Sequence, residues 1–149
     1  MMEEAQNMIM LDEKNIVLNA KFTDKWSAIQ ACGRILLENG YVKSGYLDEM
    51  IAREKSTSVY IGSGVAIPHG LAGYSKNIIH SGLSFVQVPE GVDFDGNTAY
   101  LLIGIAGKGD EHLQLLSQVA LTLMDESRVA KLVTTNKKAD VMELLKKSN

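Results

Sequence analysis

The stretch Tyr60–Gly70, with the sequence YIGSGVAIPHG, decides how the chain folds around it. Its Gly-Ser-Gly triplet favours a tight turn, because glycine adopts backbone conformations that strain other residues. The apolar run Val65–Ile67 that follows is typical of a short buried strand. Pro68 ends that strand, because proline lacks a backbone N–H and fixes φ. The pattern therefore predicts that His69 lies on a stiff backbone at the end of a buried strand, with small neighbours that leave room for another molecule.

The composition indicates one globular domain, since 46% of the 149 residues are hydrophobic and 22% are charged. The net charge of -3 argues against nucleic-acid binding, which favours a basic excess. No apolar run reaches the roughly 20 residues of a membrane-spanning helix, so we expect no membrane insertion. Glu3 and Glu4 stand where an export signal would be basic, and the single cysteine, Cys32, suits a reducing compartment. We therefore expect a cytoplasmic protein.

Strand and helix patterns alternate along the chain, which predicts an α/β fold with a mixed, mostly parallel sheet flanked by helices on both faces. Residues 1–14 are assigned to an N-terminal lead-in and residues 15–149 to the domain. Strands are expected at 15–19, 65–67, 78–88 and 99–106, with turns at 89–91 and 95–96. Helices are expected at 23–38, 44–55, 110–123, 125–133 and 138–147, the first four capped by Thr23, Ser44, Asp110 and Asp125.

Three side chains carry the chemistry that these patterns favour. His69 and His112 each follow a predicted buried strand, and strand ends line the usual ligand crevice of α/β sheets. His112 also falls in the first turn of a predicted helix, where the helix field attracts anions and favours a neutral imidazole. Arg53 lies near the end of another predicted helix, and its guanidinium matches phosphate oxygens. Together the three residues suit a phosphoryl group carried on His69, with the other two stabilising its charge.

Each of these residues also has a structural alternative, because strand-end histidines and helix-end charges are common without any catalytic role. His80, in a predicted strand, and Cys32, in a predicted helix, are expected to be structural. No Walker loop is present, so a nucleotide donor is not expected and another protein is the favoured donor. A metal-dependent hydrolase is a weaker alternative, since no H-E-x-x-H or C-x-x-C motif occurs. We expect no cofactor and no metal.

Four segments together resemble the mannitol/fructose-type enzyme IIA domain of the bacterial sugar phosphotransferase system. They are REKS (53–56), YIGSGVAIPHG (60–70), VPEGVDFDG (88–96) and GKGDEH (107–112), and the resemblance runs over about residues 15–145. It implies that His69 accepts a phosphoryl group from the phosphohistidine carrier protein and passes it to a cysteine of an enzyme IIB domain. It also implies that His112 lies beside the phosphorylated imidazole and that Arg53 contacts the phosphoryl oxygens.

The details of the match favour the mannitol branch, because Gly70 follows the histidine and a PEGV segment is present. The implied partner is then an enzyme IIB/IIC mannitol permease, and the chain is expected to be a free-standing subunit that docks transiently. Two alternatives use the same residues. One is a fructose-specific IIA, and the other is a nitrogen-type regulatory module whose phosphorylation state controls a binding partner.

Overall fold

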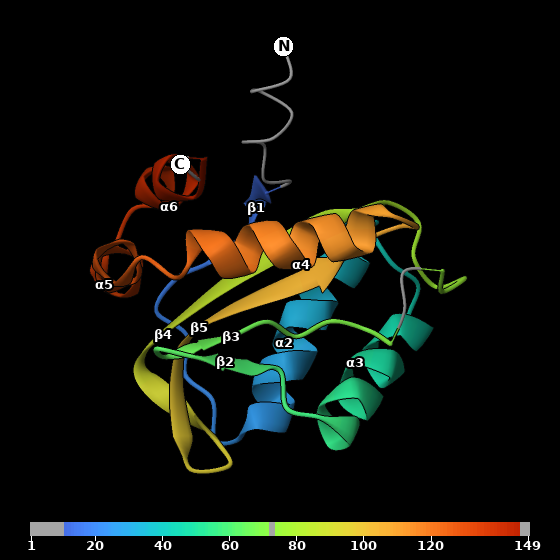
Figure 1. Ribbon diagram of the computed structural model, residues 1–149, viewed down its shortest axis with the longest axis horizontal. Helices are drawn as coiled ribbons and strands as arrows, with labels where there is room; N and C mark the ends of the chain where they lie inside the picture. Colours follow the sequence, from blue (N-terminus) through green and yellow to red (C-terminus); the bar gives the residue numbers. More distant parts are fainter. Residues whose placement is uncertain (1–10, 72–73, 147–149) are drawn as a thin grey trace.

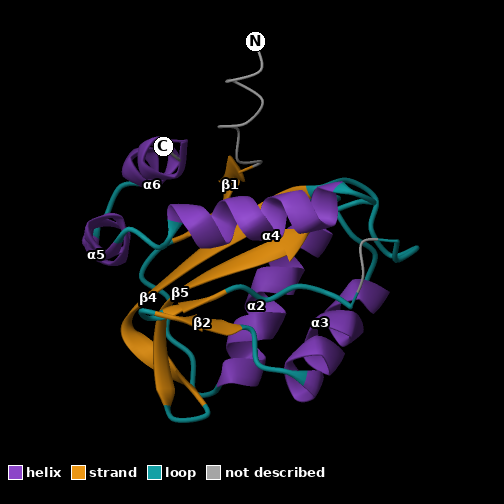
Figure 2. Cartoon of the chain, viewed as in Figure 1, coloured by secondary structure: helices purple, strands orange, loops and turns teal. Residues whose placement is uncertain are grey.

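The computed structural model describes residues 11–71 and 74–146, which form a five-stranded sheet with helices packed on both faces (Figure 1, Figure 2). The strands are β1 (Leu11–Val17), β2 (Tyr60–Gly62), β3 (Val65–Ala66), β4 (Gly82–Phe94) and β5 (Asn97–Ala106). The helices are α2 (Lys25–Glu38), α3 (Gly45–Ser56), α4 (Glu111–Thr122), α5 (Glu126–Thr134) and α6 (Lys138–Lys146). The predicted α/β architecture is therefore confirmed. No helix in the described ranges has the length and apolarity needed to cross a bilayer.

The strand order is β1-β4-β5-β3-β2, and the sheet mixes parallel and antiparallel pairs evenly. The pairs β1–β4 and β3–β5 are parallel, whereas β4–β5 and β2–β3 are antiparallel. The sheet is thus mixed as predicted, but less parallel than expected. The reason is that the predicted turn at Asp95 and Gly96 joins β4 to β5 directly as a hairpin. Both residues have positive φ, 58° and 97°, which suits a tight hairpin turn.

The other predicted turn, at 89–91, is wrong, because these residues continue β4. The pairing with β5 shifts register between Gln87 and Val92, as at a β-bulge. Three strand starts also differ from the prediction, since β5 begins at Asn97 rather than at Ala99. β1 begins at Leu11 rather than at Asn15, and β4 begins at Gly82, so His80 lies before the strand and not within it.

The helices lie where the sequence predicted them, but of the four predicted caps only Asp125 makes a capping hydrogen bond. Asp24, and not Thr23, caps α2, because its carboxylate accepts the Ser27 N–H at 2.8 Å. Asp125 caps α5 as predicted. Ser44 and Asp110 precede their helices as predicted, yet neither side chain makes a capping hydrogen bond.

Each face of the sheet has its own apolar core. Helices α2 and α3 pack on one face, and α4, α5 and α6 pack on the other. Residues of β5 alternate between the two cores, Leu101 facing the α4 side and Leu102 the α2 side. Consequently α3 and α4 lie on opposite faces of the sheet (Figure 1). A site built from residues of both helices must therefore lie at one end of the strands, here the end where β3 and β5 finish.

Candidate functional site

The chain beyond β3 brings His69 to the end of β5. The Ile105 N–H donates to the Pro68 carbonyl at 2.8 Å, and His69 itself pairs with Ile105 in parallel register. Because β3 and β5 are adjacent and parallel, the loop after β5 leaves the sheet at the same edge as His69. That loop leads into α4 and carries His112. The predicted meeting of the two imidazoles at one sheet edge is therefore what the structure shows.

The imidazole of His69 is fixed by a bond to its own main chain. Its Nδ1 lies 2.7 Å from the carbonyl oxygen of Ile67. A carbonyl can only accept, so Nδ1 carries the proton and Nε2 keeps its lone pair. Among the described residues, the solvent-excluded side-chain nitrogens and oxygens without a partner are His112 Nδ1 and Thr122 Oγ1. His69 Nε2 is not one of them, and it makes no hydrogen bond to another described residue, so part of its surface is open to solvent.

Access to His69 is narrower than the sequence suggested, because the residue is only 6% exposed. Burial lowers the pKa of the His69 imidazole, and the positive charge of Arg53 and the neighbouring His112 lower it further, against the opposing bond to Ile67. The ring is therefore neutral at pH 7. A neutral ring with one reachable nitrogen is a nucleophile that needs no base to activate it.

His112 lies in the first turn of α4, and its ring centroid is 5.7 Å from that of His69, with the planes tilted by 60°. Its Nδ1 is buried without a partner. A buried N–H without an acceptor costs more than a buried lone pair, so we assign the proton of the neutral ring to Nε2. Burial, and then the charge of Arg53, lowers the pKa of His112. A lowered pKa favours the neutral ring at pH 7, as the sequence predicted, and burial is the first cause.

The loop between β5 and α4 is folded tightly against the start of the helix. A Cβ added at Gly107 would lie 2.4 Å from Cα of His112, so only glycine permits this approach. The Lys108 N–H donates to Ser81 Oγ at 2.8 Å, and Ser81 Oγ donates in turn to the Glu111 carboxylate. These contacts fix the first turn of α4, and His112 with it, although no side chain caps the helix.

Arg53 lies in the last turn of α3, and its charge reaches both imidazoles. Its Nη1 donates to the Thr57 carbonyl at 2.5 Å, and its charge is one of the causes of the lowered pKa of His69 and of His112. The guanidinium has further N–H groups for an anion. The structure thus brings together the three residues that the sequence singled out.

Glu54, which sequence reasoning missed, anchors the end of α3 beside Arg53. It is 4% exposed, and its carboxylate accepts the Val59 N–H at 2.8 Å and pairs with Lys25 Nζ at 3.0 Å. Lys25 Nζ also lies 2.7 Å from Asp95 Oδ2. The partners of Lys25 are 29 and 70 positions away in the sequence, so no local pattern signals the network.

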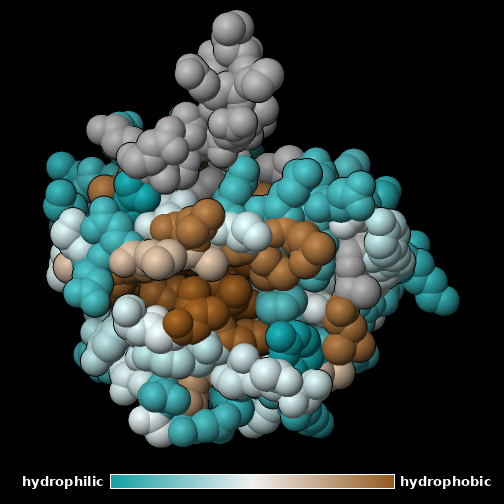
Figure 3. Space-filling view, viewed as in Figure 1, coloured by the Kyte–Doolittle hydropathy of each residue, from teal (hydrophilic) through white to brown (hydrophobic). Residues whose placement is uncertain are grey.

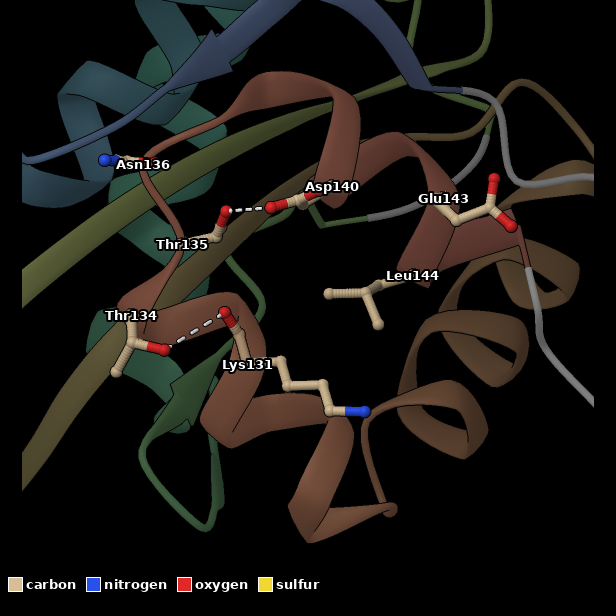
Figure 4. Close-up of a pocket in the computed structure, with 7 residues that line it drawn as sticks. All are labelled: Lys131, Thr134, Thr135, Asn136, Asp140, Glu143 and Leu144. Carbon is tan, nitrogen blue, oxygen red and sulfur yellow. Dashed lines mark hydrogen bonds between the residues drawn. The ribbon is translucent and has the colours of Figure 1, made fainter.

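Three grooves of the described surface lie away from His69 and His112. A groove of about 460 Å³ runs between α5 and α6, with Lys131 and Leu144 pointing into it (Figure 4). Grooves of about 380 and 500 Å³ are lined by residues of α2 and of the β1 end, respectively. His69 and His112 line none of these three grooves. Within residues 11–71 and 74–146, no three His, Cys, Asp or Glu side chains gather as they would around a metal ion.

Comparison with known proteins gives consistent results across sequence and structure. The family model described as "Phosphoenolpyruvate-dependent sugar phosphotransferase system, EIIA 2" matches residues 9–148. The mannitol-specific phosphotransferase enzyme IIA component of Geobacillus stearothermophilus is 42% identical over 144 residues, covering 96% of this chain and 99% of the relative.

Two solved structures from Escherichia coli have the same fold. One is a complex of enzyme IIAMTL with phosphorylated enzyme IIBMTL, with a TM-score of 0.86 at 35% identity over 93% of this chain and 98% of the matched chain. The other is a crystal structure of IIA mannitol, with a TM-score of 0.83 at 36% identity over 90% of this chain and 97% of the other. The structural similarity therefore extends over nearly the whole length of both chains in each comparison.

Proposed function

Because this chain belongs to the EIIA 2 family of the phosphoenolpyruvate-dependent sugar phosphotransferase system, we propose that His69 is the residue that carries its phosphoryl group. The observation that carries the proposal is the bond from His69 Nδ1 to the Ile67 carbonyl, which leaves Nε2 unprotonated and reachable. Phosphoryl transfer depends mainly on positioning and charge stabilisation, and little on covalent chemistry by other groups. A fixed, neutral imidazole supplies the positioning.

In the first step, Nε2 of His69 attacks the phosphorus of a phosphohistidine on the carrier protein. The phosphorus–nitrogen bond of the donor breaks as the new bond to Nε2 forms. His69 keeps its Nδ1 proton, so its ring becomes formally cationic and the bond to the Ile67 carbonyl is strengthened. The dianionic phosphoryl group and the cationic ring then partly neutralise one another.

His112 and Arg53 stabilise the phosphoryl oxygens in this scheme. The ring centroids lie 5.7 Å apart, which supports a role for the Nε2–H of His112 as a donor to an oxygen of a group on His69. Arg53 adds a permanent positive charge and free N–H donors on the α3 side. The two groups come from helices on opposite faces of the sheet, so we expect them to bind different phosphoryl oxygens.

In the second step, the thiolate of a cysteine on an enzyme IIB domain attacks the phosphorus. The bond to Nε2 breaks, and His69 returns to its neutral form with Nδ1 still protonated. No proton needs to enter or leave the ring in the cycle. The support for this partner is the likeness to the Escherichia coli enzyme IIAMTL that was solved with phosphorylated enzyme IIBMTL.

The rim of the site suits a transient protein partner. Leu71, two residues after His69, is 56% exposed, and Leu113, next to His112, is 70% exposed. Figure 3 shows further apolar surface gathered along α4 and below it. Small interfaces with exposed apolar side chains are adequate for short-lived complexes. We propose that the carrier protein and the enzyme IIB domain dock here in turn, in the cytoplasm.

We propose mannitol as the sugar, on the support of 42% identity to a mannitol-specific component. The test supplies the purified chain and the phosphorylated carrier to membranes that hold an enzyme IIB/IIC mannitol permease but no enzyme IIA. We expect mannitol phosphate to form only when the chain is present. His69→Ala should give none, whereas His80→Ala, which alters an exposed histidine before β4, should be as active as the wild type.

Other results of the same assay would favour the alternatives. Phosphorylation of fructose but not mannitol, with a fructose permease, would identify a fructose-specific subunit. A chain that is phosphorylated by the carrier but supports neither sugar would be a regulatory module.

A further inference from the structure

The hydroxyl of Tyr46, in α3, bonds both to the residue that follows His69 and to the residue of β5 that pairs with His69. The function proposed above gives Tyr46 no role. The side chain is 0% exposed. Its hydroxyl accepts the N–H of Gly70 at 2.8 Å and donates to the carbonyl of Ile105 at 2.7 Å. Gly70 directly follows His69, and Ile105 is the residue with which His69 pairs. The hydroxyl therefore connects residues 67–70, the nucleophile segment that carries His69, to β5 at the point where this segment leaves the sheet.

The main-chain ladder alone does not hold Gly70. Among the described residues, the last main-chain hydrogen bond of ordinary length between the two segments is from the Ile105 N–H to the Pro68 carbonyl, at 2.8 Å. Within the described ranges, the hydroxyl of Tyr46 is the partner of the Gly70 N–H. Burial raises the pKa of Tyr46, so the phenol keeps its proton and can donate to Ile105. Removing the oxygen would take from the buried Gly70 N–H its hydrogen bond of ordinary length, which is costly.

The ring of Tyr46 also packs against the backbone of Gly70. A Cβ added at Gly70 would lie 2.5 Å from Cε1 of Tyr46 and 3.0 Å from its hydroxyl oxygen. The glycine therefore permits the close approach that the two hydrogen bonds need. Tyr46 and Arg53 are seven residues apart in α3, about two helical turns, so they lie on the same side of the helix. One helix thus fixes both the nucleophile segment and the cation.

We propose that Tyr46 is a positioning residue for phosphoryl transfer at His69. By holding Gly70 against β5, it keeps the main chain of His69 in the conformation in which Nδ1 donates to the Ile67 carbonyl and Nε2 stays free of a proton. The bond from Nδ1 spans only two residues, so it depends directly on the local backbone conformation. This inference rests on the proposed role of His69, but it makes a separate statement about the tautomer of that ring.

The chain offers a matched control at the other end of β3. The hydroxyl of Tyr60 accepts the N–H of Gly64 at 2.9 Å and donates to the carbonyl of Thr98 at 3.3 Å. It also links a glycine N–H beside β3 to a carbonyl of β5, but away from His69. Tyr60→Phe therefore removes the same two kinds of hydrogen bond as Tyr46→Phe without touching the nucleophile segment.

The experiment compares Tyr46→Phe, Tyr60→Phe and the wild-type chain, each labelled with ¹⁵N in its histidines. The ¹⁵N shifts of His69 report the tautomer without any partner protein. The initial rate of labelling by the phosphorylated carrier reports transfer. For Tyr46→Phe we expect a mixed tautomer and a maximal rate lowered about 10-fold to 100-fold, with little change in the KM for the carrier. For Tyr60→Phe we expect wild-type shifts and rate.

A Tyr46→Phe chain with the wild-type tautomer would overturn the inference, and so would an equal loss in Tyr60→Phe. If Tyr46→Phe does not fold, Gly70→Ala serves instead, because the added methyl pushes the hydroxyl off its partners. The same mixed tautomer would support the inference, and an unchanged one would overturn it. If the wild-type chain accepts no phosphate at all, the proposed function fails, yet the shifts of His69 still decide the role of Tyr46.

Discussion

His69 and His112 have ring centroids 5.7 Å apart, yet the chain holds them by different means. The Nδ1 of His69 donates to the main chain, and its residue continues the parallel pairing of β3 with β5. His112 stands in the first turn of a helix without a side-chain cap, and its Nδ1 is buried without a partner. One tautomer is therefore set by the backbone, and the other by the cost of burying an unpaired N–H.

Under the proposed function, this difference gives different tasks to two residues of the same type. An imidazole whose proton is fixed presents the same nucleophilic nitrogen in every cycle. An imidazole with an unpaired buried nitrogen donates through its other nitrogen and can adjust as charge appears beside it. Changes at His69 should therefore stop the transfer, whereas changes at His112 should slow it.

The largest effect is expected for His69→Ala, which removes the only nitrogen that we propose to bond to phosphorus. Labelling by the phosphorylated carrier should fall by more than about 1,000-fold, to background. The measurement is the stoichiometry of acid-labile phosphate after incubation with excess carrier. His80→Ala is the control and should label fully. Full labelling of His69→Ala would remove the distinction between the two imidazoles.

Arg53→Gln should have the next largest effect, because Arg53 acts on both rings. We expect the rate of labelling to fall about 100-fold, since a charged donor to the transferring group is lost. The pKa values of His69 and His112 should both rise, because the guanidinium is a cause of their lowering. Kinetics and an NMR titration test the two parts. Arg34→Gln, an exposed change in α2, should alter neither, and an unshifted His112 would show that Arg53 does not act on it.

His112→Ala should still accept phosphate, but pass it on about tenfold more slowly. The reason is that the lost donor stabilises the phosphoryl group without bonding to phosphorus. Single-turnover transfer from the phosphorylated chain to an enzyme IIB domain measures the effect. An unchanged rate would place His112 outside the mechanism, and a complete loss of acceptance would make it equal to His69.

Gly107→Ala should act through the position of His112 alone. The added methyl would meet Cα of His112 at 2.4 Å, so the start of α4 must shift. We expect a stability loss of about 1–3 kcal/mol and a few-fold slower transfer to enzyme IIB, with the His69 tautomer unchanged. Urea unfolding and ¹⁵N shifts check these effects. Gly40→Ala is a contrasting control, since no atom lies within 4 Å of its added Cβ, although its positive φ carries its own strain.

The smallest effect concerns pH. Both histidines have a pKa below the ordinary value of 6.5, so the unfolded chain binds protons there before the folded chain does. Stability should therefore fall as the pH drops below about 6.5, and stop falling below the folded pKa values. The labelling rate should be flat near pH 7 and decline in the same acidic range. A double variant, His69→Ala with His112→Ala, should lose this part of the pH dependence of unfolding.

Sequence reasoning predicted where His69 and His112 lie in the fold because the signals for their positions are local. Pro68 ends a short apolar strand, and Asp110 precedes an amphipathic helix, so both histidines could be placed at element ends. It missed the partners of these elements. Tyr46 bonds to Gly70 and Ile105, which are 24 and 59 positions away, and no spacing within α3 signals such a contact.

The sheet was misjudged for a similar reason. The residues Pro89, Glu90 and Gly91 have turn composition, but a bulge accommodates them within β4, and the hairpin turn follows at Asp95 and Gly96. Burial of His69 was also underestimated, since the small neighbours in sequence do not include Tyr46 and His112, which pack near it from other elements.

The central claim is that the main chain sets which nitrogen of His69 receives the phosphoryl group. The most direct test phosphorylates the ¹⁵N-labelled chain with the carrier protein and reads the phosphorus–nitrogen coupling by NMR. We expect one phosphoryl group per chain, bonded to Nε2 of His69, with Nδ1 still protonated. A phosphoryl group on Nδ1 of His69, or on His112, would contradict the account.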